Sequence, residues 1–125
     1  MDCITDIGGK PYIIDYKTCA DASNDAFMRD AIRFGYHVQS AMYSDGVEHN
    51  IGTKPTFVFI AQEKTAPYAL NIFQADEAFV QYGEDVFREL IGVYHYCRTT
   101  NNFYGYLGRE QIINNLQLPA WMAKE

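Results

Sequence analysis

The chain has 125 residues, enough for one domain with a single hydrophobic core and too few for two. Hydrophobic residues make up 48% of it and aromatic residues 15%, which excludes a disordered protein. The net charge of −6 disfavours a protein that binds nucleic acid only by covering phosphates with basic side chains. It does not exclude a metal-dependent nuclease, because such a site concentrates carboxylates around a cation.

The sequence predicts a cytoplasmic protein without membrane association. Its apolar runs are far shorter than the roughly 20 residues of a membrane span, and it shows no secretory signal pattern at its start. Its three cysteines are widely spaced and odd in number, which argues against a disulfide framework and for a reducing compartment. No repeat or linker is visible, so we expect a single domain over residues 1–125.

The first predicted element is a hairpin, in which a Gly-Gly turn within 6–11 joins short strands at 3–5 and 12–17. Capping residues at 21–24 then precede a helical stretch from about 25 to 48. We expect Gly35 to divide this stretch into two helices in series, or to kink it.

The second half of the chain again shows two predicted strands followed by a helix, without sequence similarity to the first half. The nearly continuous apolar run at 56–61 is typical of a strand buried on both faces, and a second strand follows at 68–73. A long helix is expected from 75–77 to about Thr99, followed by a turn-rich tail. This order predicts an α/β fold with a mixed sheet flanked by helices.

Two charged residues lie on the otherwise apolar run at 12–17. Strict alternation along a strand puts Asp15 and Lys17 on the same face. A carboxylate and an ammonium so placed can bind a divalent cation and orient a water beside it. Strand pairing about the Gly-Gly turn can bring Asp2 towards Asp15 as a second oxygen ligand. The alternative for the pair alone is an exposed ion pair, which is common and contributes little to stability.

The helical stretch places Gln39 and Tyr43 on one face, because residues four positions apart are neighbours on a helix. Their amide and hydroxyl groups can donate to phosphate oxygens, and the ring can pack on a sugar or a base. The alternative for Tyr43 is a half-buried helix residue with its hydroxyl in water.

Asp2, the Asp15-Tyr16-Lys17 segment and the Gln39-x-x-x-Tyr43 helix together resemble the PD-(D/E)xK nuclease pattern, in the variety with a Gln-x-x-x-Tyr helix. Nearly the whole chain is also similar to the C-terminal half of the catalytic domain of RecE-type exonucleases (exodeoxyribonuclease VIII). The segments with this similarity are 14–18, 20–23, 34–46, 57–61, 63–64, 67–68 and 118–121.

The resemblance implies an exodeoxyribonuclease that uses Mg²⁺ (or Mn²⁺) to hydrolyse one strand of linear duplex DNA from its 5′ end. It also implies an oligomeric ring and a single-strand annealing protein as partner in phage-type recombination. In the roles that it implies, Asp2 and Asp15 are metal ligands and Lys17 positions or polarises the attacking water. Gln39 and Tyr43 would line the DNA path.

The chain departs from this family in length. The family's catalytic domain is about twice as long, and its N-terminal half, with a further metal ligand on a helix, has no counterpart here. We therefore expect a restriction-endonuclease-like core that is truncated on its N-terminal side. Two alternatives to an active nuclease follow: an inactive remnant that binds a protein as an inhibitor or accessory factor, and a site that other chains complete in trans.

Overall fold

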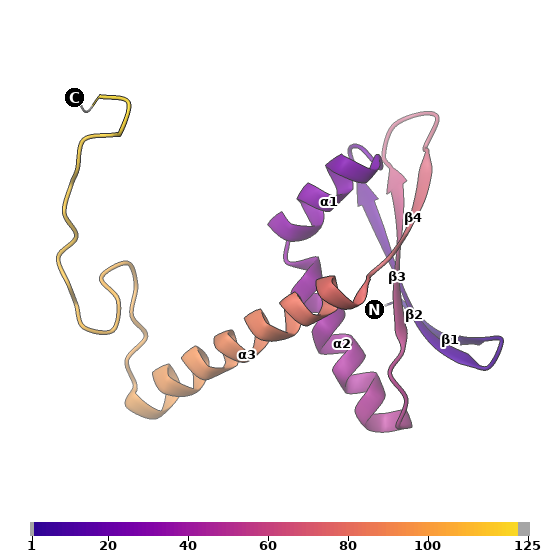
Figure 1. Cartoon of the computed structure of the whole chain (residues 1–125), viewed down its shortest axis with the longest axis horizontal. Helices are drawn as coiled ribbons and strands as arrows, with labels where there is room; N and C mark the ends of the chain where they lie inside the picture. Colours follow the sequence, from indigo (N-terminus) through magenta and orange to yellow (C-terminus); the bar gives the residue numbers. More distant parts are fainter. Residues whose placement is uncertain (1, 123–125) are drawn as a thin grey trace. The chain divides into compact units, whose positions relative to one another are not determined.

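The computed structural model describes residues 2–122, which form two compact units that divide between Glu89 and Leu90. The first unit contains every strand, two helices and the start of a third; the second contains the rest of that helix and the tail (Figure 1). The elements are β1 (Cys3–Ile7), β2 (Lys10–Cys19), α1 (Asn24–Arg33), α2 (Tyr36–Ile51), β3 (Thr56–Glu63), β4 (Leu70–Gln74) and α3 (Glu77–Thr100). The single domain over 1–125 stays a prediction.

The four strands form one mixed sheet in the order β1-β2-β3-β4. The central pair β2 and β3 is parallel, with Tyr12 opposite Thr56, and both outer pairs are antiparallel. Gly8 and Gly9 connect β1 to β2 with φ of +61° and +81°, as a tight hairpin turn of this kind requires. The predicted hairpin and mixed sheet with flanking helices are confirmed, and each predicted strand is present with bounds shifted by a few residues.

The predicted helical stretch is two helices, separated at Gly35. This residue has φ of +73°, a left-handed conformation that glycine adopts without steric cost. The chain leaves α1 with the Phe34 N–H donating to the Asp30 carbonyl, and α2 begins directly after Gly35. Tyr36 is therefore the first residue of α2, at a fixed position above the sheet.

The core lies between the sheet and the two helices, which pack on one face of it (Figure 1). From the sheet it contains Ile13, Phe57 and Phe59, and from α1 Phe27, whose ring stacks on Phe73 of β4 at 4.5 Å. Burial along β3 alternates, so the prediction of a strand buried on both faces is wrong. The apolar run is continuous, but the helices of this unit cover only one of its faces.

The start of α3 touches α2 through a glycine. A Cβ atom at Gly83 would lie 1.9 Å from the carbonyl oxygen of His37, far inside contact distance. We expect Gly83→Ala to lower the free energy of unfolding by about 1–3 kcal/mol, because the two helix backbones must move apart. Urea unfolding followed by circular dichroism measures this.

Gly46 in α2 is the matched control, since a Cβ atom there would meet nothing within 4 Å. Gly46→Ala should raise the stability by about 0.5–1 kcal/mol, through the helix propensity of alanine alone. Equal effects of the two substitutions would show that the contact between Gly83 and His37 is absent in solution.

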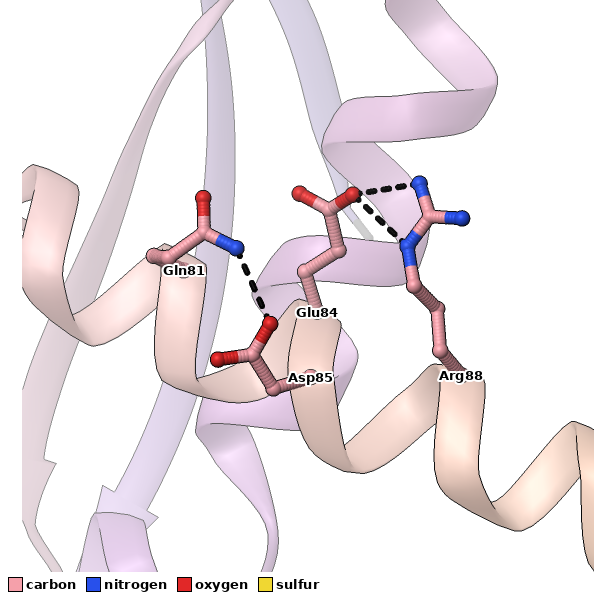
Figure 2. A network of polar contacts seen from close by, with 4 residues as sticks. All are labelled: Gln81, Glu84, Asp85 and Arg88. Carbon is pink, nitrogen blue, oxygen red and sulfur yellow. Dashed lines mark hydrogen bonds and ion pairs between the residues drawn. The ribbon is translucent and has the colours of Figure 1, made fainter.

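Side chains on the exposed side of α3 form two contacts at a spacing of four residues (Figure 2). Arg88 donates from Nε and Nη2 to Glu84 Oε1, at 3.0 and 2.6 Å, and Gln81 donates to Asp85 Oδ1 at 3.0 Å. The hydrogen bond and charge of Glu84 raise the pKa of Arg88. Such pairs support a helix locally and contribute little to global stability.

The second unit continues α3 to Thr100 and then forms turns. The Arg109 guanidinium lies over the Tyr96 ring, 4.3 Å from its centroid, and 5.9 Å from that of Tyr104. Cation–π contact of this kind ties the turn after α3 to the end of the helix. None of the helices described in either unit has the length and apolarity of a membrane span.

Candidate active site

Asp15 and Lys17 lie together on β2, on the face that the helices cover. Alternation along the strand puts them on the same side as Ile13, which is fully buried. Lys17 Nζ is 3.0 Å from Asp15 Oδ1, so the two side chains form an ion pair. The structure brings these two predicted site residues together; their catalytic role stays a prediction.

Asp15 is 2% exposed, which is unusual for a carboxylate. Moving a charge out of water costs several kcal/mol, and an ion pair in the interior recovers this only in part. The Lys17 side chain is 18% exposed, so its ammonium lies at the boundary between the buried carboxylate and solvent. The exposed ion pair considered as an alternative is therefore excluded for Asp15.

The aromatic ring of Tyr36, at the start of α2, packs against the Lys17 ammonium. Lys17 Nζ lies 4.5 Å from the centroid of the Tyr36 ring, within cation–π distance. The ring in turn stacks on Phe59 of β3, with centroids 5.6 Å apart. Lys17 is thus held between a carboxylate on its own strand and an aromatic face at the start of α2.

Gln39 and Tyr43 lie one turn apart on α2, as predicted, and both are half-buried. A hydrogen bond from the Gln39 side chain lowers the pKa of the Tyr43 hydroxyl below its usual 10.0, and the charge of Asp15 acts weakly in the opposite direction. Gln39 Oε1 is buried without a hydrogen-bond partner among residues 2–122.

The contact between Gln39 and Tyr43 predicts a shift in a titration. Gln39→Leu removes the donor that stabilises the phenolate, so the pKa of Tyr43 should rise towards its usual value. Carbon-13 NMR of ring-labelled tyrosine, titrated from pH 8 to 12, follows this hydroxyl. Gln81→Leu on α3 is the control. If both variants titrate Tyr43 as the unaltered chain does, the hydrogen bond does not form in solution.

Asp2 lies at the open end of the hairpin, beside Asp15. The register pairs Cys3 with Ile14, and its continuation sets Asp2 opposite Asp15. The Asp2 N–H donates to the Ile14 carbonyl at 3.2 Å, and Asp2 Oδ2 accepts from the Tyr16 N–H at 2.6 Å. The structure therefore places Asp2 opposite Asp15 in the strand register, and one of the two carboxylate oxygens of Asp2 is bound to the backbone of β2.

The site thus consists of a carboxylate and an ammonium on β2, with Asp2 directly before β1. Comparisons with known proteins give the family and the fold of the chain. The profile of a family described as a PDDEXK-like domain of unknown function matches residues 1–115. The chain belongs to this family. No curated protein matches the sequence.

The fold of this PDDEXK-like domain is similar to a crystal structure described as a candidate exonuclease from Eubacterium rectale. The TM-score is 0.63 at 15% sequence identity, and the similarity covers 93% of this chain and 52% of the other. The chain thus spans about half the length of that protein. These findings confirm the PD-(D/E)xK fold class and leave RecE-type membership a prediction.

Two carboxylates of the PDDEXK-like domain, those of Asp2 and Asp15, are the candidate ligands of a divalent metal ion. Groups of three or more His, Cys, Asp or Glu side chains placed to hold a metal ion are absent from residues 2–122. Mg²⁺, however, is commonly held by one or two carboxylates, with waters and substrate phosphates completing its shell. Asp2 and Asp15 fit the acidic part of such a site in their donor chemistry.

Tyr36 is the residue of this site that the sequence analysis missed. Alternation and helix spacing identify partners within one element, whereas Tyr36 and Lys17 meet only when α2 packs on β2. A signal was nevertheless present, because Gly35 marks the start of a new helix and an aromatic residue follows it directly. The first residue of a helix after such a break is held close to the sheet, so an aromatic residue there is a candidate contact for the strand side chains.

Proposed function

We propose that the chain is the part of a metal-dependent exodeoxyribonuclease that hydrolyses phosphodiester bonds of linear double-stranded DNA from the 5′ end. The observation that supports this most is the buried ion pair on β2, in which Asp15 is 2% exposed and 3.0 Å from Lys17. An ion pair so buried costs more free energy than apolar residues of the same size, so a functional reason for it is favoured.

Each site residue has a part in the proposed reaction. Asp2 and Asp15 would hold Mg²⁺ or Mn²⁺, which when bound lowers the pKa of its water and stabilises charge on the phosphate. Lys17 donates hydrogen bonds to the attacking water or to a phosphate oxygen, with its position fixed by Tyr36. Gln39 and Tyr43 hold the DNA strand through amide and hydroxyl contacts.

The setting of this reaction follows from the resemblance to RecE-type exonucleases. We place the protein in the cytoplasm, in phage-type recombination, as a homo-oligomer that works with a single-strand annealing protein. With a net charge of −6 the chain repels DNA at long range, so we expect cleavage to depend on a divalent ion that supplies positive charge at the site.

A matched pair of DNA substrates tests the exonuclease proposal. Linear duplex labelled at either 5′ or 3′ end, and the same sequence as a closed circle, are incubated with the chain and Mg²⁺. Release of 5′-terminal nucleotides from the linear form only is expected. Cleavage of the circle would show an endonuclease, and no cleavage of any substrate with Mg²⁺ or Mn²⁺ would contradict nuclease activity of this chain.

The second candidate is an inactive nuclease remnant that binds a protein as an inhibitor or accessory factor. It is favoured by the hydrogen bond that occupies Asp2 Oδ2 and by the half-length match to the Eubacterium rectale protein. In that case Asp15→Asn would leave the biological effect of the chain unchanged, whereas a nuclease would lose it.

A further inference from the structure

The turn between α1 and α2 presents an aromatic ring beside the candidate site. Phe34 follows the last residue of α1 and is 58% exposed. Its ring centroid lies 6.0 Å from that of Tyr36, and the Tyr36 centroid lies 4.5 Å from Lys17 Nζ. One aromatic side chain therefore separates the exposed ring from the ammonium of the site.

Backbone hydrogen bonds fix the position of the Phe34 ring. The Phe34 N–H donates to the Asp30 carbonyl at 2.8 Å. The next N–H, that of Gly35, donates to the Ile32 carbonyl at 3.2 Å. The Gly35 carbonyl in turn accepts from the Gln39 N–H at 3.1 Å, so the turn is bonded to both helices. A ring on such a turn loses little conformational entropy when a flat molecule packs on it.

Two arginines bring positive charge to this part of an acidic chain. Arg33 Cζ lies 5.4 Å from the centroid of the Phe34 ring. Arg29 lies one turn earlier on α1, and both arginines are exposed. The ion pairs between side chains of residues 2–122 use neither of them. Guanidinium groups in this setting can bind phosphate oxygens.

We infer that Phe34 stacks on an unpaired base of the DNA strand in the site, and that Arg33 binds a phosphate of the same strand. This rests on the proposed nuclease function and adds to it the part of the substrate that lies beside the scissile bond. In a duplex the neighbouring bases cover the face of each base. An exposed aromatic side chain can therefore stack only on an unpaired or terminal nucleotide, as in proteins that bind single strands.

The distances limit which nucleotide this is. The Phe34 ring can be no farther from Lys17 Nζ than the two steps of 6.0 and 4.5 Å together. Successive bases of a strand in a helix are about 3.4 Å apart, so the stacked base lies within about three nucleotides of a phosphate bound at Lys17. The contact is therefore with the strand that is being cleaved.

A matched set of substitutions tests the two contacts. Phe34→Leu keeps an apolar side chain but removes the ring, whereas Phe34→Trp keeps an aromatic face. Arg33→Gln removes a charge, and its control Lys54→Gln removes one from an exposed residue past the other end of α2. The 16 residues of that helix separate these two positions by roughly 24 Å.

Fluorescence anisotropy measures the binding of a linear duplex with a short single-stranded 5′ end. Ca²⁺ replaces Mg²⁺ so that the DNA stays intact, and denaturing gels verify this. With the unaltered chain, 5-iodouracil is placed in the single-stranded end and irradiated. It forms a cross-link to an aromatic ring on which it stacks, and mass spectrometry locates the residue.

Phe34→Leu should bind this DNA about tenfold more weakly, within the range of one stacked base, and Phe34→Trp should bind as the unaltered chain does. The cross-link is expected at Phe34. Arg33→Gln should lose several-fold in affinity at low salt, and Lys54→Gln much less. Equal affinities of the unaltered chain and Phe34→Leu, or cross-links only at other residues, would overturn the stacking contact. Equal losses in Arg33→Gln and Lys54→Gln would overturn the phosphate contact.

Cleavage with Mg²⁺, assayed on the same proteins, separates this inference from the nuclease proposal. If the unaltered chain cleaves DNA and Phe34→Leu binds it equally tightly, the inference is overturned and the nuclease proposal stands. If binding depends on the Phe34 ring but the unaltered chain cleaves nothing, the inference is supported and nuclease activity is contradicted. An unaltered chain that does not bind the DNA would overturn the inference.

Discussion

Asp15→Asn should abolish Mg²⁺-dependent cleavage of linear duplex DNA, with a loss of about 10³-fold or more. The amide has nearly the shape of the carboxylate but lacks the charge that holds a cation. Without a bound cation the transition state loses several kcal/mol of stabilisation. The cleavage rate falls tenfold for about each 1.4 kcal/mol lost. Initial rates of nucleotide release measure the effect, at a temperature where circular dichroism shows the variant folded.

Calorimetric titration of Mg²⁺ and Mn²⁺ gives a second readout that does not need activity. Binding by the unaltered chain should be lost in Asp15→Asn and kept in Asp25→Asn, which changes an exposed aspartate in the first turn of α1. Equal metal affinity of the unaltered chain and both variants would show that Asp15 is not a metal ligand. This would favour the inactive remnant over the nuclease.

Lys17→Met should lower the cleavage rate by about 10²-fold to 10³-fold, the usual cost of losing one donor to a developing negative charge. Methionine keeps most of the length and the apolar stem of lysine but not its ammonium. The substitution should also lower the free energy of unfolding by about 1–3 kcal/mol, less than the loss of a fully buried partner, because Lys17 is in part exposed.

Lys17→Arg separates these two effects. Arginine keeps a positive charge beside Asp15, so stability should be mostly retained, but its planar fork cannot place donors where one ammonium did. Rates from single-turnover cleavage and midpoints of urea unfolding measure the two quantities. A Lys17→Arg chain as active as the unaltered one would limit the role of Lys17 to general electrostatics, and an equally stable Lys17→Met chain would show that the ion pair contributes nothing to folding.

Local patterns predicted the elements that position the site. The Gly-Gly pair predicted the hairpin because both residues adopt positive φ, and Gly35 predicted the helix break for the same reason. Alternation along β2 predicted that Asp15 and Lys17 share a face. These signals succeed because the geometry concerned is set by residues within a few positions of one another.

The predictions that failed or fell short depend on contacts between elements. The apolar run of β3 indicated burial on both faces, and the sequence pattern does not reveal that α1 and α2 both pack on the same face. The burial of Asp15 and the contact of Lys17 with Tyr36 likewise arise from the packing of α2. The hydrogen bond from Tyr16 to Asp2 depends on how the hairpin ends.

The connection between the two parallel strands sets the order in which the site can form. The β1–β2 hairpin closes over two residues, a contact that forms in microseconds, and it already brings Asp2 beside the backbone of β2. Pairing of Tyr12 with Thr56 must instead enclose both helices, a long-range closure that folds more slowly. Only this closure brings Phe59 and Tyr36 against Asp15 and Lys17. The arrangement of the site therefore needs both the hairpin and this long-range closure, and the metal-dependent chemistry that we propose depends on both.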